Sequence, residues 1–286
     1  MELDSNARWL KTSEEIFPHR PHAMTLAFQT EQYRYRMHEH DFYEINIILE
    51  GSGYHYIESR QLKVNVGDMF VIPPGVLHGY ENIDPVFNVF HLVANKSFFT
   101  KYAEEIKLLG QFKVLFEIEP YLRVNERNFY INLDYDFLTE LKSDITILES
   151  IKSDVTDESD TIRNIITLKI ISSLCRYAKQ NSDRINKNEP KEYQDIMRAL
   201  EYIHNNYSEK ITIPDLAKLC NVSKATFLRK FKSVTKTSPN KYLLFCRAKN
   251  ARRLLDGGLS RTATAQLCGF FDISHMDRVL SSYDNT

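Results

Sequence analysis

The hydrophobic period changes once along this chain, and that change limits the fold more than any other feature. From Tyr33 to about Val93, apolar and polar residues alternate in short runs, which Gly51-Ser52-Gly53 and Gly67-Asp68 separate. From about Ser97 onward, apolar residues recur every three or four positions. Short alternating runs predict a β-sandwich or barrel, and the longer period predicts helices. The strands we expect are Met24–Phe28, Tyr43–Leu49, Tyr54–Ile57, Leu62–Val66, Met69–Ile72 and Val86–Val93.

A polar segment divides the chain into two predicted domains. Asn181–Lys191 is polar and contains Pro190, which is typical of a linker. We place the first domain at residues 1–190, with a barrel at about 24–93 and helices at about 97–181, and an all-helical domain at 191–286. Within the first domain, Ile162–Tyr177 predicts an amphipathic helix. That helix either packs on its own β-domain or pairs two chains into a homodimer.

Composition and cysteine spacing indicate a cytoplasmic protein without a membrane segment. Of 286 residues, 43% are hydrophobic, which is enough for packed cores, yet no apolar run approaches the ~20 residues of a membrane helix. The first 30 residues are too charged for a signal peptide. The four cysteines form no C-x-x-C pair, so we expect buried free thiols in a reducing compartment.

Charge is distributed unevenly between the two predicted domains. Residues 191–286 contain 16 basic and 9 acidic residues, whereas the rest of the chain contains 21 basic and 29 acidic ones. Between Lys218 and Arg253 there are eleven basic residues and no acidic residue. A solvated helical surface normally mixes both signs, so this window favours a polyanionic partner, most often nucleic acid. A merely basic surface is the alternative.

The second domain contains an internal repeat. Leu219-Cys220-Asn221-Val222 aligns with Leu267-Cys268-Gly269-Phe270 at an offset of 48, and Ala217 and Ala265 precede the two turns at the same distance. A small residue lets two helices cross closely, and Gly or Asn supplies the positive φ of a tight turn. This pattern is typical of a helix-turn-helix, so we expect two such units.

The helix after the first turn has a surface suited to the major groove of DNA. Ser223 is a good N-cap, and Phe227, Leu228 and Phe231 form the stripe that we expect to be buried. The residues left outward are Lys224, Ala225, Thr226, Arg229 and Lys230. Lys and Arg reach guanine edges or phosphates, and Ala and Thr contact thymine methyl groups.

These motifs resemble the AraC/XylS family of bacterial transcription regulators. The resemblance covers Ile213–Tyr283 and includes T-S-P-x-x-Y-L at Thr237–Leu243 and R-A-x-x-A-R-x-L-L at Arg247–Leu255. It implies two recognition helices, Ser223–Val234 and Asp272–Ser281, in successive major grooves about 34 Å apart. The second helix would contribute Ile273, Ser274, His275 and Arg278 to DNA binding.

The second unit departs from the family pattern. The family usually has two buried isoleucines where this chain has Arg261 and Thr264, and phenylalanines where it has Met276 and Leu280. It also usually has Gly at the position of Lys236, and it continues for another helix beyond the position of Thr286. We therefore expect a shortened second unit that is less stable than the first.

The β-domain carries two further motifs. His38, His40, Glu44 and Gly51 form H-x-H-x3-E-x6-G, and G-x5-P-x-G-x2-H-x3-N runs from Gly67 through His78 to Asn82. On strands, His38, His40, Phe42, Glu44 and Asn46 share one face, and Ile45, Ile47 and Leu49 share the other. An inward polar row is unfavourable unless it binds something.

Both motifs resemble those of the cupin family, which implies a double-stranded β-helix barrel over about Tyr33–Val93. The resemblance also implies a divalent metal held by His38, His40, Glu44 and His78. Alternatively, these residues hydrogen-bond an effector without metal, so no cofactor is required. We expect an effector site, for a carbohydrate, at His38, His40, Phe42, Glu44, Tyr54, Tyr56 and His78, although the aromatics among them also suit a barrel core. The other histidines have no spacing that indicates a function.

The leading hypothesis is a transcription regulator controlled by a small-molecule effector, not an enzyme. Its predicted partners are double-stranded DNA, the effector, RNA polymerase and a second copy of the chain. The runner-up is a metal-dependent cupin isomerase or dioxygenase with a vestigial DNA-binding tail. A third hypothesis is a truncated regulator that folds but does not discriminate DNA sequences.

Overall fold

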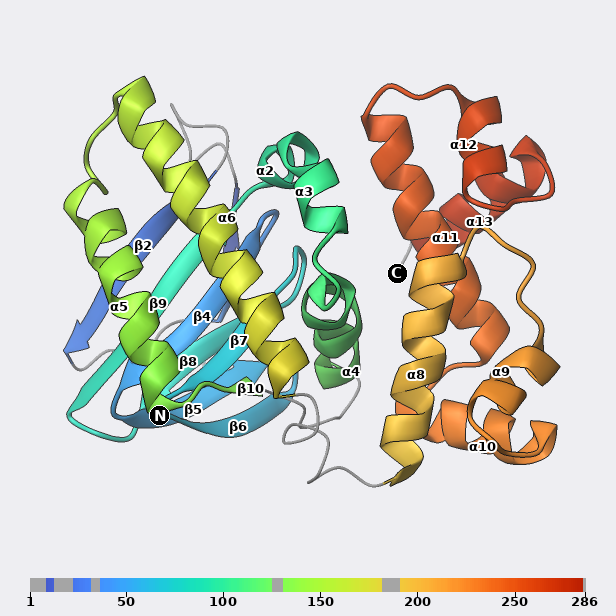
Figure 1. Ribbon diagram of the computed structural model, residues 1–286, viewed down its shortest axis with the longest axis horizontal. Coiled ribbons are helices and arrows are strands. Elements are labelled where there is room, and N and C mark those ends of the chain that lie inside the picture. Colours follow the sequence, from blue (N-terminus) through green and yellow to red (C-terminus); the bar gives the residue numbers. More distant parts are fainter. Residues whose placement is uncertain (1–8, 13–22, 32–36, 125–130, 182–190, 285–286) are drawn as a thin grey trace. The chain divides into compact units, whose positions relative to one another are not determined.

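The computed structural model describes residues 9–12, 23–31, 37–124, 131–181 and 191–284 (Figure 1). The chain divides into two compact units, Met1–Ile185 and Asn186–Thr286. The domain boundary predicted at residue 190 lies outside the described residues. No helix in the described part of the chain is long and apolar enough to cross a membrane.

Two five-stranded sheets form the first unit. One sheet has the order β1-β3-β8-β5-β6, and the other has the order β10-β7-β4-β9-β2. The first comprises β1 (Trp9–Lys11), β3 (His38–His40), β8 (His78–Asn82), β5 (Ser52–Ile57) and β6 (Arg60–Asn65). The second comprises β10 (Ile131–Asn132), β7 (Asp68–Ile72), β4 (Tyr43–Glu50), β9 (Val86–Ala94) and β2 (Ala23–Glu31). The all-β barrel predicted from the alternating pattern is therefore confirmed.

Strand alternation sorts the residues of the second sheet into an inner and an outer row. Ile45 and Ile47 of β4 belong to a core that also contains residues of the covering helices, such as Phe137 and Leu141. Glu44 and Asn46 point to the opposite face, into the barrel, because successive side chains of a strand alternate. The predicted parity of this strand is thus confirmed.

Helices follow the barrel and cover its second sheet. They are α2 (Lys96–Lys101), α3 (Ala103–Lys107), the π-helix η1 (Val114–Ile118), α4 (Glu119–Val124), α5 (Tyr135–Ser150) and α6 (Asp157–Gln180). In Figure 1, α5 and α6 lie across the sheet that contains β2, β9 and β4. Ile166, Ile170 and Leu174 of α6 join the same core as the outer row of β4. Of the two alternatives for Ile162–Tyr177, packing on its own β-domain is therefore the one observed.

The second unit is entirely helical in its described residues. It contains α8 (Lys191–Asn206), α9 (Ile213–Leu219), α10 (Lys224–Thr235), α11 (Pro239–Asp256), α12 (Arg261–Leu267) and α13 (Ile273–Asp284). The pairs α9–α10 and α12–α13 are the two predicted helix-turn-helix units. Asn221 and Gly269 take φ values of 53° and 72°, which confirms the left-handed turns expected at these positions.

Candidate functional site

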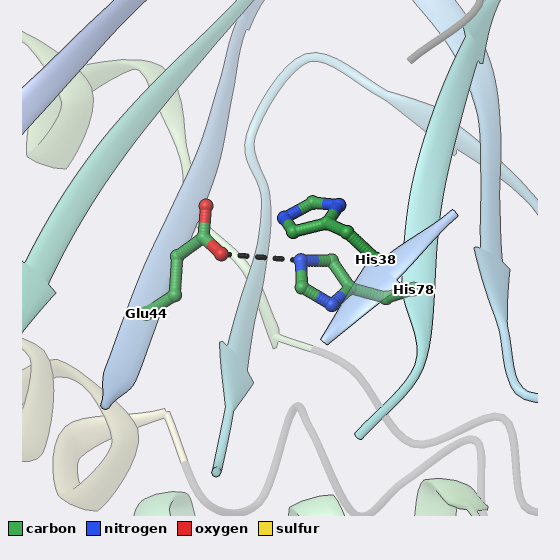
Figure 2. A group of neighbouring side chains, drawn as sticks. All are labelled: His38, Glu44 and His78. Carbon is green, nitrogen blue, oxygen red and sulfur yellow. Dashed lines mark hydrogen bonds and ion pairs between the residues drawn. The ribbon is translucent and has the colours of Figure 1, made fainter. Parts of the chain in front are cut away.

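Three histidines converge on one buried carboxylate inside the barrel. Nε2 of His40 and Nε2 of His78 lie 3.0 Å and 3.1 Å from Oε2 of Glu44. His38 completes a group with Glu44 and His78 whose donor atoms all lie within 4.8 Å of one another (Figure 2). All four residues are at most 4% exposed. They come from β3 and β8 of one sheet and β4 of the other, so the cluster bridges both sheets.

Backbone carbonyls fix the proton positions on two of these rings. Nδ1 of His40 lies 2.8 Å from the carbonyl oxygen of Phe42, and Nδ1 of His78 lies 3.1 Å from that of Val76. Because a carbonyl can only accept, each Nδ1 carries a proton. When the ring is protonated, Nε2 donates a hydrogen bond to Glu44; when the ring is neutral, Nε2 and the carboxylate both present lone pairs, which a cation between them would bind. Metal-binding histidines are oriented in this way by the partner of the other ring nitrogen. The donor set therefore fits a divalent metal ion.

Burial and neighbouring charge shift the pKa values in this cluster. Burial alone would raise the pKa of Glu44. The charge of His91 and the hydrogen bonds from His40, His78 and His91 hold that pKa well below its ordinary value. Burial lowers the pKa of His78, against the opposing effect of Glu44. Glu44 is therefore ionised and His78 is favoured in its neutral form, which are the states that bind metals.

The sequence interpretation missed His91, which contacts the other oxygen of Glu44. Nδ1 of His91 hydrogen-bonds Oε1 of Glu44. His91 lies directly opposite Asn46 in the β4–β9 pairing. With its nitrogen toward the carboxylate, the Asn46 amide donates to Oε1 at 3.0 Å and accepts from the Tyr80 hydroxyl at 2.9 Å. The available signal was a histidine in the inward row of β9, between Val89 and Val93.

The structure does not bring every predicted effector residue to this cluster. Phe42 does belong to it, since its ring stacks on His40 at a centroid distance of 4.3 Å. Tyr54 and Tyr56 do not, because they flank His55 on β5 and therefore face away from the barrel interior. His55 faces inward instead, and its ring stacks on Tyr80 at 4.5 Å. The period of two on β5 explains this placement.

The first recognition helix presents most of its predicted residues to solvent. Ser223 caps α10 by accepting a hydrogen bond from the backbone N–H of Thr226 at 3.2 Å. Lys224, Ala225 and Arg229 are exposed, whereas Thr226 is half-buried beside the cap. Lys230 is less available than predicted, because its Nζ lies 3.6 Å from a carboxylate oxygen of Asp195 on α8.

The second recognition helix, α13, divides its predicted residues into two groups. Ser274 and Arg278 are exposed. Ile273 packs against the apolar core of this unit. The ring of His275 lies edge-on to Phe270 at a centroid distance of 5.5 Å. Ile273 and His275 therefore turn partly away from the surface that Ser274 and Arg278 share.

Comparison with known families matches both units. Residues 21–185 match the AraC-like ligand binding domain, and residues 216–283 match a helix-turn-helix domain. The chain is 24% identical over 268 residues to the uncharacterized HTH-type transcriptional regulator YbfI of Bacillus subtilis, covering 92% of this chain and 88% of that protein. It is 23% identical over 267 residues to the HTH-type transcriptional activator RhaS of Pectobacterium atrosepticum, covering 93% and 90% respectively.

A solved structure of ToxT from Vibrio cholerae covers 93% of this chain and 96% of its own, at 12% identity and a TM-score of 0.35. The family matches are the stronger finding, since the ligand-binding match alone spans more than half of the chain. The chain belongs to the AraC family of DNA-binding transcription regulators, with a ligand-binding domain ahead of its helix-turn-helix domain.

Proposed function

We propose that this regulator holds a divalent metal ion at Glu44 and that the occupied site controls DNA binding. The observation that carries the proposal is the convergence of His40 and His78, with both Nδ1 protons committed to backbone carbonyls, on one buried carboxylate. His38, His40, Glu44 and His78 would hold the ion. Bound there, the ion supplies a Lewis-acidic centre that can ligate hydroxyl or carboxylate groups.

His91 and Asn46 would position the metal-binding carboxylate. Both lie on the Oε1 side of Glu44, whereas His40 and His78 lie on the Oε2 side. Residues that orient a metal ligand typically contribute 10- to 100-fold to metal affinity. His91→Asn should therefore weaken metal binding by about that factor.

The organic effector predicted from the sequence is a carbohydrate, and this proposal places it beside the metal site. Phe42 supplies an aromatic face within the cluster. Tyr54 and Tyr56 lie on the other side of β5 and are not part of the proposed site. A ligand that binds one arrangement of the two units more tightly would shift the population toward it.

The first test is metal content of the full chain after loading with Zn²⁺, Mn²⁺, Ni²⁺ or Fe²⁺. We expect about one metal ion per wild-type chain, because the four proposed ligands form a single site. His78→Ala should lose it. His275→Ala removes a half-buried histidine of the other unit and should keep it. A wild-type chain that takes up no metal would overturn the metal proposal.

DNA binding of the full chain then separates a regulator from an enzyme. DNA fragments from upstream of the gene are titrated with and without metal and with a panel of sugars, at fixed salt. A change in sequence-selective affinity supports regulation. The runner-up, a metal-dependent isomerase or dioxygenase, is favoured by the same three-histidine and one-carboxylate donor set. Bound metal with no effect on DNA affinity, and turnover of a sugar, would favour that enzyme.

A homodimer and contact with RNA polymerase complete the proposal. Because the apolar face of α6 packs on its own sheet, a dimer that used α6 would pair through the exposed stripe of that helix. The exposed stripe of α6 includes Thr161, Ile165, Lys169 and Arg176, which is mostly polar. A sedimentation mass equal to one chain at micromolar concentration, with and without DNA, would contradict the dimer.

A further inference from the structure

The two helix-turn-helix units differ by one residue between the turn and the second helix. In the first unit, a single residue, Val222, separates the left-handed Asn221 from the N-cap Ser223. In the second unit, Phe270 and Phe271 separate the left-handed Gly269 from Asp272. Asp272 accepts a hydrogen bond from the backbone N–H of His275 at 2.7 Å, as an N-cap does. The second unit therefore has one extra residue in front of its recognition helix.

The extra residue is a phenylalanine that takes no part in the core. Phe270 occupies the inner position, is 7% exposed and belongs to the apolar cluster of this unit. Phe271 is 92% exposed, a higher value than that of any other exposed large hydrophobic residue in the described part of the chain. An exposed aromatic side chain contributes little to folding, so its stabilising role is small.

Phe271 lies at the N-terminal end of α13, directly before the N-cap Asp272 and outside the helix itself. Ser274 and Arg278, four residues apart within α13, share one face of that helix. Both of those residues are exposed, whereas Met276 and Leu280 of the opposite face are buried. In helix-turn-helix proteins, the N-terminal residues of the recognition helix contact base edges in the major groove.

The apolar side chain of Phe271 limits which features of DNA it can recognise. A phenyl ring makes no conventional hydrogen bond, and the C5-methyl group of thymine is the apolar feature of the major groove. We propose that Phe271 contacts a thymine methyl group and thereby contributes to the sequence preference of the second unit. The inference rests on DNA binding by this domain and adds a residue that the sequence interpretation did not include.

The test removes single methyl groups from the DNA. A preferred duplex is first selected from random DNA with the full chain, and each thymine is then replaced by deoxyuridine, which lacks only the methyl group. At one position, we expect the wild type to bind about fourfold more weakly, because one methyl group is no longer buried against the protein. Phe271→Ala should bind the parent duplex about fourfold more weakly and be insensitive to that replacement.

Leu267→Ala is the matched control, because Leu267 is an exposed apolar residue (55%) that ends α12, before the turn, and not beside the recognition helix. That variant should remain sensitive to the same deoxyuridine. If Phe271→Ala keeps the full methyl dependence, the inference is overturned. Unchanged DNA binding by Phe271→Ala together with lost transcription activation would also overturn it and would indicate a protein partner. Failure of the wild type to enrich any sequence would overturn DNA reading by the whole domain.

Discussion

Asn221 in the first helix-turn-helix unit and Gly269 in the second occupy equivalent positions in different surroundings. Both are left-handed, with φ values of 53° and 72°. Asn221 is exposed. Gly269 instead lies against the loop before α9, where an added Cβ would be 2.3 Å from the carbonyl oxygen of Ser208. The turn at Asn221 needs only a residue that tolerates a left-handed backbone. The turn at Gly269 also needs a residue without a side chain, because Ser208 leaves no room for one.

The same contrast extends to charge. The first unit has exposed Lys218, Lys224, Arg229 and Lys232 on and around its recognition helix. In the second unit, Arg261 forms an ion pair with Asp277. Arg278 is the exposed basic residue of α13 itself. The two units thus share a backbone plan but differ in how much exposed positive charge their recognition helices carry.

The largest expected effect is that of Gly269→Ala. The left-handed conformation costs a non-glycine residue about 1–2 kcal/mol, and the clash with Ser208 adds about 1–3 kcal/mol. We expect α12 and α13 to lose about 3 kcal/mol of stability. Native-state hydrogen exchange, resolved by helix, measures it within the full chain.

Asn221→Ala provides the comparison for that result. It meets only the conformational penalty, so α9 and α10 should lose about 1 kcal/mol. Gly257→Ala is a further control, because its φ of −77° is ordinary and its nearest neighbours are 3.4 Å away. Equal losses for Gly269→Ala and Asn221→Ala would show that the Ser208 contact is not important.

The second prediction concerns DNA affinity and its dependence on salt. Lys224→Ala combined with Arg229→Ala removes two exposed cations of the first unit, so the slope of log affinity against log salt should fall by about 2. Arg278→Ala should reduce it by about 1. Fluorescence anisotropy over a salt series checks both. A larger loss for Arg278→Ala than for the double variant would reverse the proposed ranking of the two units.

Much of this architecture could be predicted from local sequence. The period of two in β4 placed Glu44 inside the barrel, because alternation follows from strand geometry. The positive φ of Asn221 and Gly269 followed from residue type and spacing. These features depend on residues close together in the chain.

Features that depend on pairing between distant segments were harder to predict. The pairing register of β4 and β9 places His91 beside the carboxylate of Glu44, which is 47 residues away in the chain. Tyr54 and Tyr56 were assigned to the effector site by residue type, but the parity of β5 turns them outward and His55 inward. Phe271 was overlooked because the repeat was aligned at a single offset, and the insertion follows the aligned segment.

The smallest expected effect concerns a buried hydroxyl in the second unit. Thr264 is fully buried on α12, and its hydroxyl has no hydrogen-bond partner. A buried polar group without a partner costs about 1–3 kcal/mol. Thr264→Val replaces the hydroxyl with a methyl group of similar size, and helix propensities of Thr and Val are similar. We therefore expect α12 and α13 to gain about 1 kcal/mol by hydrogen exchange.

Thr235→Val is the matched variant in the first unit, and its effect should have the opposite sign. Thr235 is equally buried, but its hydroxyl donates to the carbonyl oxygen of Phe231 at 2.7 Å. The same hydroxyl accepts from the backbone N–H of Thr237 at 3.4 Å. Removing it should cost α10 about 1 kcal/mol, because these bonds are lost and the Thr237 N–H loses an acceptor. A loss of stability in both variants would mean that packing around Thr264, and not its hydroxyl, sets the stability of the second unit.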